Sequence, residues 1–150
     1  VFNTANGRTV YGGGGITPDV SIKAPKRKYP FVIGKFHGGT PFDRACFEFA
    51  TQYGVNHQNL KDDFEIFFSD FEVSNEMVEA FKEQVSDSGI SFTQEEFDSD
   101  LDVIKLQLKR SVARNMWGDE EAGKVGSSGD VQLQKALLLF NTHEMLVENK

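Results

Sequence analysis

The chain has 150 residues, a formal net charge of −7 and 39% hydrophobic residues, among them 14 phenylalanines. This length fits one domain, or a small domain with an appendage, and the apolar content is sufficient for a core. The acidic balance argues against a general nucleic-acid-binding protein, which would carry a basic surface. No apolar run approaches the length of a membrane span, and no signal peptide is visible, as expected of an excised or processed piece.

Residues 1–22 are predicted to form β-structure. Asn6-Gly7 is a strong signal for a two-residue hairpin loop, because both positions of a type I′ turn need positive φ. The arms would be Val1–Thr4 and Arg8–Tyr11. Strands this short do not form a stable sheet alone, so we expect the hairpin to belong to a larger one. Its open edge is expected to be disordered, to pair with a second copy or to fold back onto the helices.

Residues 23–39 are predicted to be a linker. They contain Pro25, Pro30 and the pair Gly38-Gly39, which interrupt regular structure. The basic run Lys26-Arg27-Lys28 could contact phosphate or a membrane. In an acidic chain it is better explained as a solvated part of the linker.

Residues 40–150 are predicted to be helical, so the fold class is mainly α, with a bundle of about five helices after the hairpin. Each of the first three helices has start or stop signals in the sequence. The first begins at Thr40-Pro41 and ends at Gly54, the second opens at Asp62-Asp63, and the third runs from Ser74 to Gly89.

The fourth predicted helix is the best defined. Thr93 and Glu96 form a capping box, and Gly118 marks the end. A loop rich in Gly and Ser is expected from Asp119 to Gly129, and Asp130 caps a last helix. The apolar stripe of the fourth helix comprises Phe97, Leu101, Ile104, Leu108, Val112 and Met116, and the last helix carries Leu133, Leu137, Phe140 and Met145.

Several residues could carry chemistry, and each has a structural alternative. The run Gly12–Gly15 suggests a phosphate loop, but Ile16-Thr17-Pro18-Asp19 follows it without a helix or a useful lysine, which favours a flexible connection. The acidic residues Asp98, Asp100 and Asp102, with Glu95 and Glu96, could form a metal site. They are better explained as a solvated helix start, because carboxylates suit the positive end of a helix and the spacing lacks the features of a calcium loop.

Nucleophiles and metal ligands give no stronger signal. Cys46 is interpreted as a small buried hydrophobic residue, because no histidine lies at a suggestive spacing. Ser127-Ser128 falls in the predicted loop, which gives poor support for a rigid catalytic site. The three histidines make no pair with metal-ligand spacing; they are His37, His57 and His143.

A set of phenylalanines at helical spacing could line a peptide-binding groove. Such residues more often form the core, and some could instead face an absent part of a larger protein. The set comprises Phe64, Phe67, Phe68, Phe71, Phe81, Phe92 and Phe97.

Two segments near the start carry a specific combination of residues. Phe2, Thr4 and Gly7-Arg8 are followed by Gly15-Ile16 and then Pro18-Asp19-Val20. This combination resembles the last conserved stretch of the carboxy-terminal processing, or tail-specific, serine peptidase family. The helical part resembles the carboxy-terminal extension of a bacterial subset of that family, most clearly in residues 102–109, 113–118 and 134–137.

The resemblance implies a parent serine endopeptidase of the Ser–Lys type, with a PDZ domain that binds substrate carboxy termini, in the bacterial cell envelope. In the family the catalytic residues lie upstream of the Gly-Arg segment, and no position here matches them. We therefore assign no catalytic, cofactor-binding or metal-binding residue, and expect the fragment to be inactive alone. The implied partners are the protease core and PDZ domain of the parent.

Two main functions follow as expectations. The chain is the non-catalytic end of a tail-specific peptidase, with a structural or regulatory role in docking, access to the cleft or assembly. Alternatively, it is an independent helical module that binds a peptide or protein through exposed phenylalanines. A phosphate-binding domain that uses the glycine run is a third, weaker hypothesis.

Overall fold

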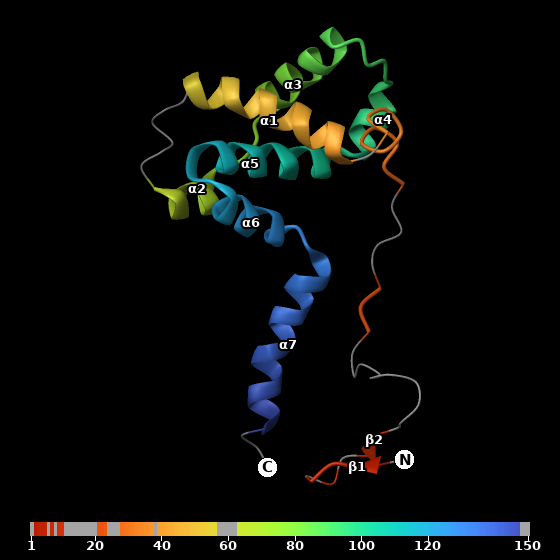
Figure 1. Ribbon diagram of the computed structural model, residues 1–150, viewed down its shortest axis with the longest axis vertical. Coiled ribbons are helices and arrows are strands. Elements are labelled where there is room, and N and C mark those ends of the chain that lie inside the picture. The colour runs from red at the N-terminus through yellow and green to blue at the C-terminus, as the bar shows by residue number, and fades with distance from the viewer. Residues whose placement is uncertain are drawn as a thin grey trace.

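The computed structural model describes residues 2–5, 7, 9–10, 21–23, 28–37, 39–56 and 63–147, with side chains as far as residue 139 except at 10, 55 and 56. The fold is mainly α, as the sequence predicts (Figure 1). The described residues form seven helices: α1 (Gly39–Asn56), α2 (Phe64–Asp70), α3 (Asn75–Asp87), α4 (Gln94–Ser99), α5 (Leu101–Trp117), α6 (Asp119–Ser128) and α7 (Val131–Val147).

Helix α5 is the central element of the helical body. It packs against α1 on one side and α6 on another, and α3 lies against α1 (Figure 1). Helix α7 leaves this body and extends away from it, with α6 as its main neighbour. The expectation that the last helix belongs to the bundle is therefore wrong.

Helix α2 is attached to α5 by one lysine and several aromatic rings. The Nζ atom of Lys109 donates a 2.8 Å hydrogen bond to the carbonyl oxygen of Phe68, and it also lies over the rings of Phe67 and Phe68. Burial lowers the pKa of Lys109, although the nearby carboxylates of Glu72 and Asp70 act in the opposite direction. This half-buried ammonium ties α2 to the middle of α5.

The predicted hairpin is present, with a different register. Strand β1 (Phe2–Asn3) pairs antiparallel with β2 (Thr9–Val10), so that Asn3 lies opposite Thr9. A two-residue loop at positions 6–7 would instead place Asn3 opposite Val10. The observed register puts one more residue in the loop, and Gly7 has the positive φ of +75° that such three-residue loops need at their last position.

Several helix starts are confirmed by their capping hydrogen bonds. The Asp63 carboxylate accepts from the amides of Glu65 and Ile66, and the Ser74 hydroxyl accepts from that of Met77. Both reciprocal bonds of the Thr93 and Glu96 capping box are present. These side chains satisfy backbone amides that have no partner within the helix. The Asp130 carboxylate caps α7 in the same way, through the amides of Gln132 and Leu133.

Three predicted boundaries are wrong. Gly54 does not end the first helix but lies buried within α1, where a Cβ atom would come 2.9 Å from the Asn115 side chain of α5. The fourth predicted helix is divided at Asp100 into α4 and α5. Residues 119–128 form α6 rather than a loop, because Ala122 and Val125 bury their side chains and three acidic residues occupy the first turn. These differences account for seven helices in place of about five.

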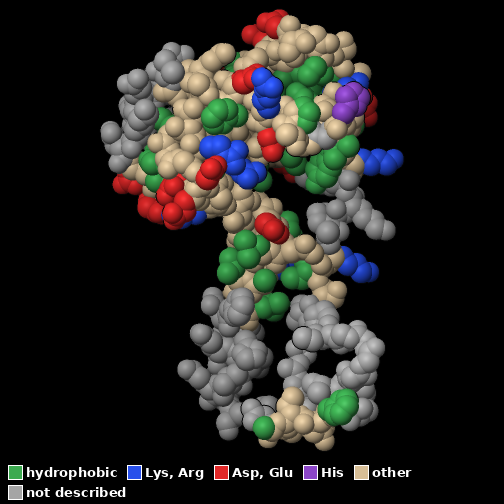
Figure 2. All heavy atoms as spheres, in the orientation of Figure 1, with side chains coloured by type: hydrophobic (Ala, Val, Ile, Leu, Met, Phe, Trp, Pro, Cys, Tyr) green, Lys and Arg blue, Asp and Glu red, His purple; other side chains and the backbone are tan. Residues whose placement is uncertain are grey.

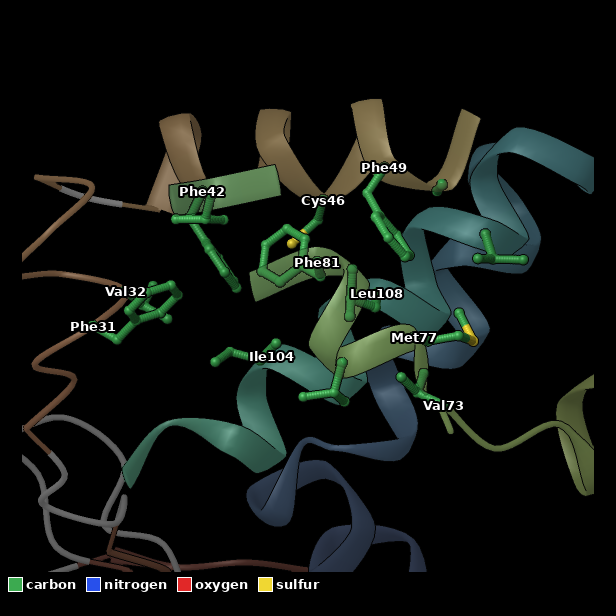
Figure 3. Packing of buried hydrophobic residues seen from close by; sticks show 14 of the residues in the cluster. Phe31, Val32, Phe42, Cys46, Phe49, Val73, Met77, Phe81, Ile104 and Leu108 are labelled. Carbon is green, nitrogen blue, oxygen red and sulfur yellow. The ribbon is translucent and has the colours of Figure 1, made fainter. Parts of the chain in front are cut away.

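The core lies between α1, α3 and α5, and Figure 3 shows phenylalanines of α1 and α3 meeting aliphatic residues of α5 there. Phe42 and Phe49 reach it from α1, Phe81 from α3 and Leu108 from α5. Part of the predicted linker also contributes to this core, since Phe31, Val32 and Phe36 are buried in it. Residues 29–36, which were predicted to be part of the linker, therefore belong to the helical domain.

Candidate functional site

The three aspartates at the junction of α4 and α5 are not one site. Asp98 and Asp102 are exposed, and Asp98 accepts a 2.7 Å hydrogen bond from Gln94. Asp100 is 0% exposed, so the expectation of a solvated helix start is wrong for this residue. Among the described parts of the chain, no group of three or more His, Cys, Asp or Glu side chains could hold a metal ion.

Asp100 caps a turn that lies far from it in the sequence. Its Oδ2 atom accepts hydrogen bonds of 2.9 Å from the backbone amides of both Phe31 and Val32. These amides open the turn in which Ile33 and Lys35 donate back to Tyr29 and Phe31, so they have no partner within the turn itself. A carboxylate is a strong acceptor for such amides. We call residues 29–36 the docked turn.

Two further contacts hold the docked turn against α4. The Nζ atom of Lys35 lies 3.0 Å from Oε1 of Glu96, whose other oxygen accepts the amide of Thr93. The Thr93 amide, and then Lys35, hold the pKa of Glu96 below its usual range. The ring of Phe31 is surrounded edge-on by other phenylalanines, with centroid distances of 5.4 Å to Phe36, 5.0 Å to Phe92 and 4.9 Å to Phe97.

A second feature is the exposed apolar surface of α7. Its first half leaves five aliphatic side chains exposed, and Figure 2 shows hydrophobic side chains gathered below the helical body. We call them the α7 apolar surface: Val131, Leu133, Leu137, Leu138 and Leu139. Large exposed apolar patches on a protein surface are typical of sites that bind another molecule.

The other candidate reactive residues do not form a reactive centre where the structure describes them. Cys46 is buried, as predicted, and burial raises the pKa of its thiol. The hydroxyls of Ser127 and Ser128 donate to carbonyls of their own helix, those of Gly123 and Val125. His37 is exposed, whereas residue 57, the side chain of residue 143 and the glycine run at 12–15 lie outside the described residues.

The phenylalanine set belongs to the core, as the structural interpretation predicts. Phe67, Phe81 and Phe97 are buried. The other four are partly buried and pack against the same cluster; they are Phe64, Phe68, Phe71 and Phe92. These rings do not provide an exposed groove, so the alternative function cannot depend on them.

Neither the buried role of Asp100 nor the exposure of α7 was predicted. The sequence signal that could have indicated the exposed apolar surface is the small number of charged residues in α7.

The chain was compared with known protein families, curated proteins and solved structures. The model of DUF8443, a family of unknown function, matches residues 43–118, which is 76 of the 150 residues. The chain belongs to this family. No curated protein matches the chain, and no solved structure does. The matched range runs from α1 to the residue after α5, so the docked turn, α6 and α7 lie outside it.

Proposed function

We propose that this member of the DUF8443 family is the non-catalytic carboxy-terminal region of a tail-specific serine endopeptidase. Its helical domain would dock on the catalytic part of the parent protein, in the bacterial cell envelope, and so shape access to the cleft or assembly. The family proposal rests on the residues from Phe2 to Val20 that resemble the end of the peptidase core.

The hairpin is the observation that carries this proposal. It bears Phe2, Thr4 and Gly7 of the motif, and its sheet has two strands among the described residues. Strands of two residues are marginal alone, and Phe2 is 66% exposed. The hairpin also lies away from the helical body, which does not cover it (Figure 1). These features support the proposal that β1 and β2 belong to a larger sheet, as the resemblance implies.

Removal of the helical domain from the full-length gene product tests the docking role. Cleavage of a peptide with a free carboxy terminus would be measured for the intact protein and for a variant that ends at residue 27, before the docked turn. We expect at least a tenfold change in kcat/KM, because a surface that the helical domain covers would be exposed. Equal kcat/KM in both proteins, at equal folded content by circular dichroism, would contradict a regulatory role.

The α7 apolar surface supports a second candidate, an independent module that binds a protein or peptide partner. It differs from the first in what α7 contacts: a foreign chain, or the rest of the same protein. Purification of the full-length protein from its native source distinguishes them. A stoichiometric foreign chain that is lost on the change Leu137→Glu would favour the module.

Among the described residues, no helix combines the length and apolar character needed to cross a membrane.

A further inference from the structure

The docked turn closes its own backbone hydrogen bonds. The amides of Ile33 and Gly34 donate to the carbonyl oxygen of Tyr29, and the amide of Lys35 donates to the carbonyl oxygen of Phe31. Among the described residues, no backbone–backbone hydrogen bond joins the turn to the rest of the chain. The turn is therefore held on the helical body by contacts with side chains of that body.

Five side chains of the helical body receive the turn. The Oδ2 atom of Asp100 accepts the amides of Phe31 and Val32, and the Glu96 carboxylate pairs with Lys35. Three phenylalanines lie around the Phe31 ring. We call the five side chains the acceptor surface: Phe42, Phe92, Glu96, Phe97 and Asp100. Main-chain hydrogen bonds combined with one anchoring aromatic ring are typical of peptide recognition. The acceptor surface has these features, and residues 29–36 are its occupant.

The helical body has a core that does not depend on the turn. The rings of Phe42 and Phe49 in α1 contact the ring of Phe81 in α3 directly, with centroid distances of 6.3 Å and 5.7 Å. Figure 3 shows Phe31 at one end of the labelled core residues. The family model matches residues 43–118, a range that includes four of the five acceptor side chains and excludes the turn. These features favour a helical body that stays folded when the turn leaves it.

The residue that follows the turn has an unfavourable backbone conformation. His37 has a φ of +55°, and no other non-glycine residue among those described has a positive φ. In this region the Cβ atom lies too close to the backbone. Such a conformation persists only where the surrounding structure imposes it. Release of the turn would let His37 relax, which favours an open state.

We propose that the docked turn is a releasable strap: residues 29–36 leave the acceptor surface while α1, α3 and α5 stay folded, and then bind it again. The Phe31 ring anchors the strap, and the Asp100 carboxylate accepts its amides. Release adds eight residues to the connection between the hairpin and α1, which lengthens it by at most roughly 26–29 Å. The strap therefore limits how far the helical domain can move from the strands before it, and this holds independently of the proposed function.

Native-state hydrogen exchange of the wild-type 150-residue chain, followed by NMR, tests the release. The amides of Phe31 and Val32 report on the turn, because both bond to Asp100. Those of Leu108 and Val112 report on the body, because both residues are buried in α5. Amides that open locally exchange faster than amides that need global unfolding.

After correction for intrinsic rates, we expect the two turn amides to exchange at least a hundredfold faster than the two α5 amides. They should still exchange at least tenfold more slowly than in an unfolded chain. Equal rates for the turn and for α5 would show that the turn is an inseparable part of the core, and would overturn the inference. Turn amides without any protection would show that the turn is not docked, which would also overturn it.

Binding of the turn as a separate peptide tests the acceptor surface. The probe is a synthetic peptide of residues 28–37. The protein is the full 150-residue chain with Phe31→Ala, which removes the anchor of the internal strap and leaves the acceptor surface unchanged. We expect the peptide to bind this variant at least tenfold more tightly than it binds the wild-type chain, whose own strap competes at an effective concentration of about millimolar.

Two altered peptides give the matched comparison. A peptide with Phe31→Ala should bind the variant chain at least tenfold more weakly than the wild-type peptide. A peptide with Ile33→Ala should bind within about twofold of the wild-type peptide, because Ile33 is 56% exposed. Equal affinity of the wild-type peptide for both chains, or no binding to a folded Phe31→Ala chain, would overturn the inference. The exchange measurement needs no substitution, so it decides the inference even when Phe31→Ala prevents folding.

Discussion

The carboxylate of Asp100 accepts a 2.9 Å hydrogen bond from the backbone amide of Phe31, which precedes it by 69 residues. The same oxygen accepts the amide of Val32. This contact joins the segment before α1 to the junction of α4 and α5, and it brings the Phe31 ring into the core. The helical domain therefore begins at the docked turn, which precedes residues 43–118, the range that the family model matches.

We expect Asp100→Ala to lower the free energy of unfolding by about 2–6 kcal/mol, because it leaves two buried amides without their carboxyl acceptor and each such loss costs about 1–3 kcal/mol. Urea denaturation followed by circular dichroism measures the effect. Asp98→Ala is the matched control, because Asp98 is exposed two residues away. A loss below about 1 kcal/mol for Asp100→Ala would show that the docked turn is held in another way.

The Glu96 carboxylate, which accepts the Thr93 amide and pairs with Lys35, predicts a pH dependence of stability. The folded state lowers the pKa of Glu96, so its stabilising contribution is fully present above the unfolded pKa of about 4.3 and is lost as the pH falls through the folded value. Glu96→Gln removes this contribution. Thermal melts from pH 7 to pH 3 should show a Tm difference between wild type and variant that is largest near neutrality and shrinks in acid. A difference that stays constant over this range would contradict the assignment.

Gly123→Ala tests the correction of residues 119–128 from loop to helix. Apart from its chain neighbours and the backbone of α6 itself, no atom lies within 4 Å of the Cβ position at Gly123, which is in the interior of α6. Alanine is favoured over glycine there by about 0.5–1 kcal/mol, so this variant should be more stable by that amount. Gly34→Ala should have the opposite sign, since its Cβ would lie against the carbonyl oxygen of Pro30. Destabilisation by Gly123→Ala would argue against a helix here.

Cys46 provides a probe of global opening. Its side chain is 0% exposed, and burial raises the pKa of the thiol, so the reactive thiolate is suppressed in the folded chain. We expect a disulfide reagent to modify Cys46 at least a hundredfold more slowly in buffer than in 6 M urea, in the 150-residue chain. Rapid modification without denaturant would show that the α1 side of the core opens locally.

The sequence predicted the parts of the fold that depend on neighbouring residues. The capping box of Thr93 and Glu96 is local, and so is the positive φ of Gly118 after α5. Division of the fourth helix at Asp100 was not predictable in this way, because its carboxylate binds amides from residues 31 and 32. The apolar stripe of that helix continues across the break, which conceals it from a test of periodicity.

The same distinction applies to the two features of functional interest. Asp100 has a sequence context like that of its exposed neighbours, and only the fold buries it. Leu133 and Leu137 have the spacing of core residues in a helix, which predicted burial within the bundle. That spacing indicates an apolar face, and it does not identify the element that covers the face.

Peptide cleavage by the full-length gene product, with the 150-residue chain measured beside it, tests the central claim most directly. The substrate would be a peptide with an apolar, free carboxy terminus, and product formation would be followed by mass spectrometry. We predict that the full-length protein cleaves it and that the 150-residue chain does not. Cleavage by the 150-residue chain, or no cleavage by a folded full-length protein across a peptide library, would contradict the proposal that this chain is the non-catalytic end of a tail-specific peptidase.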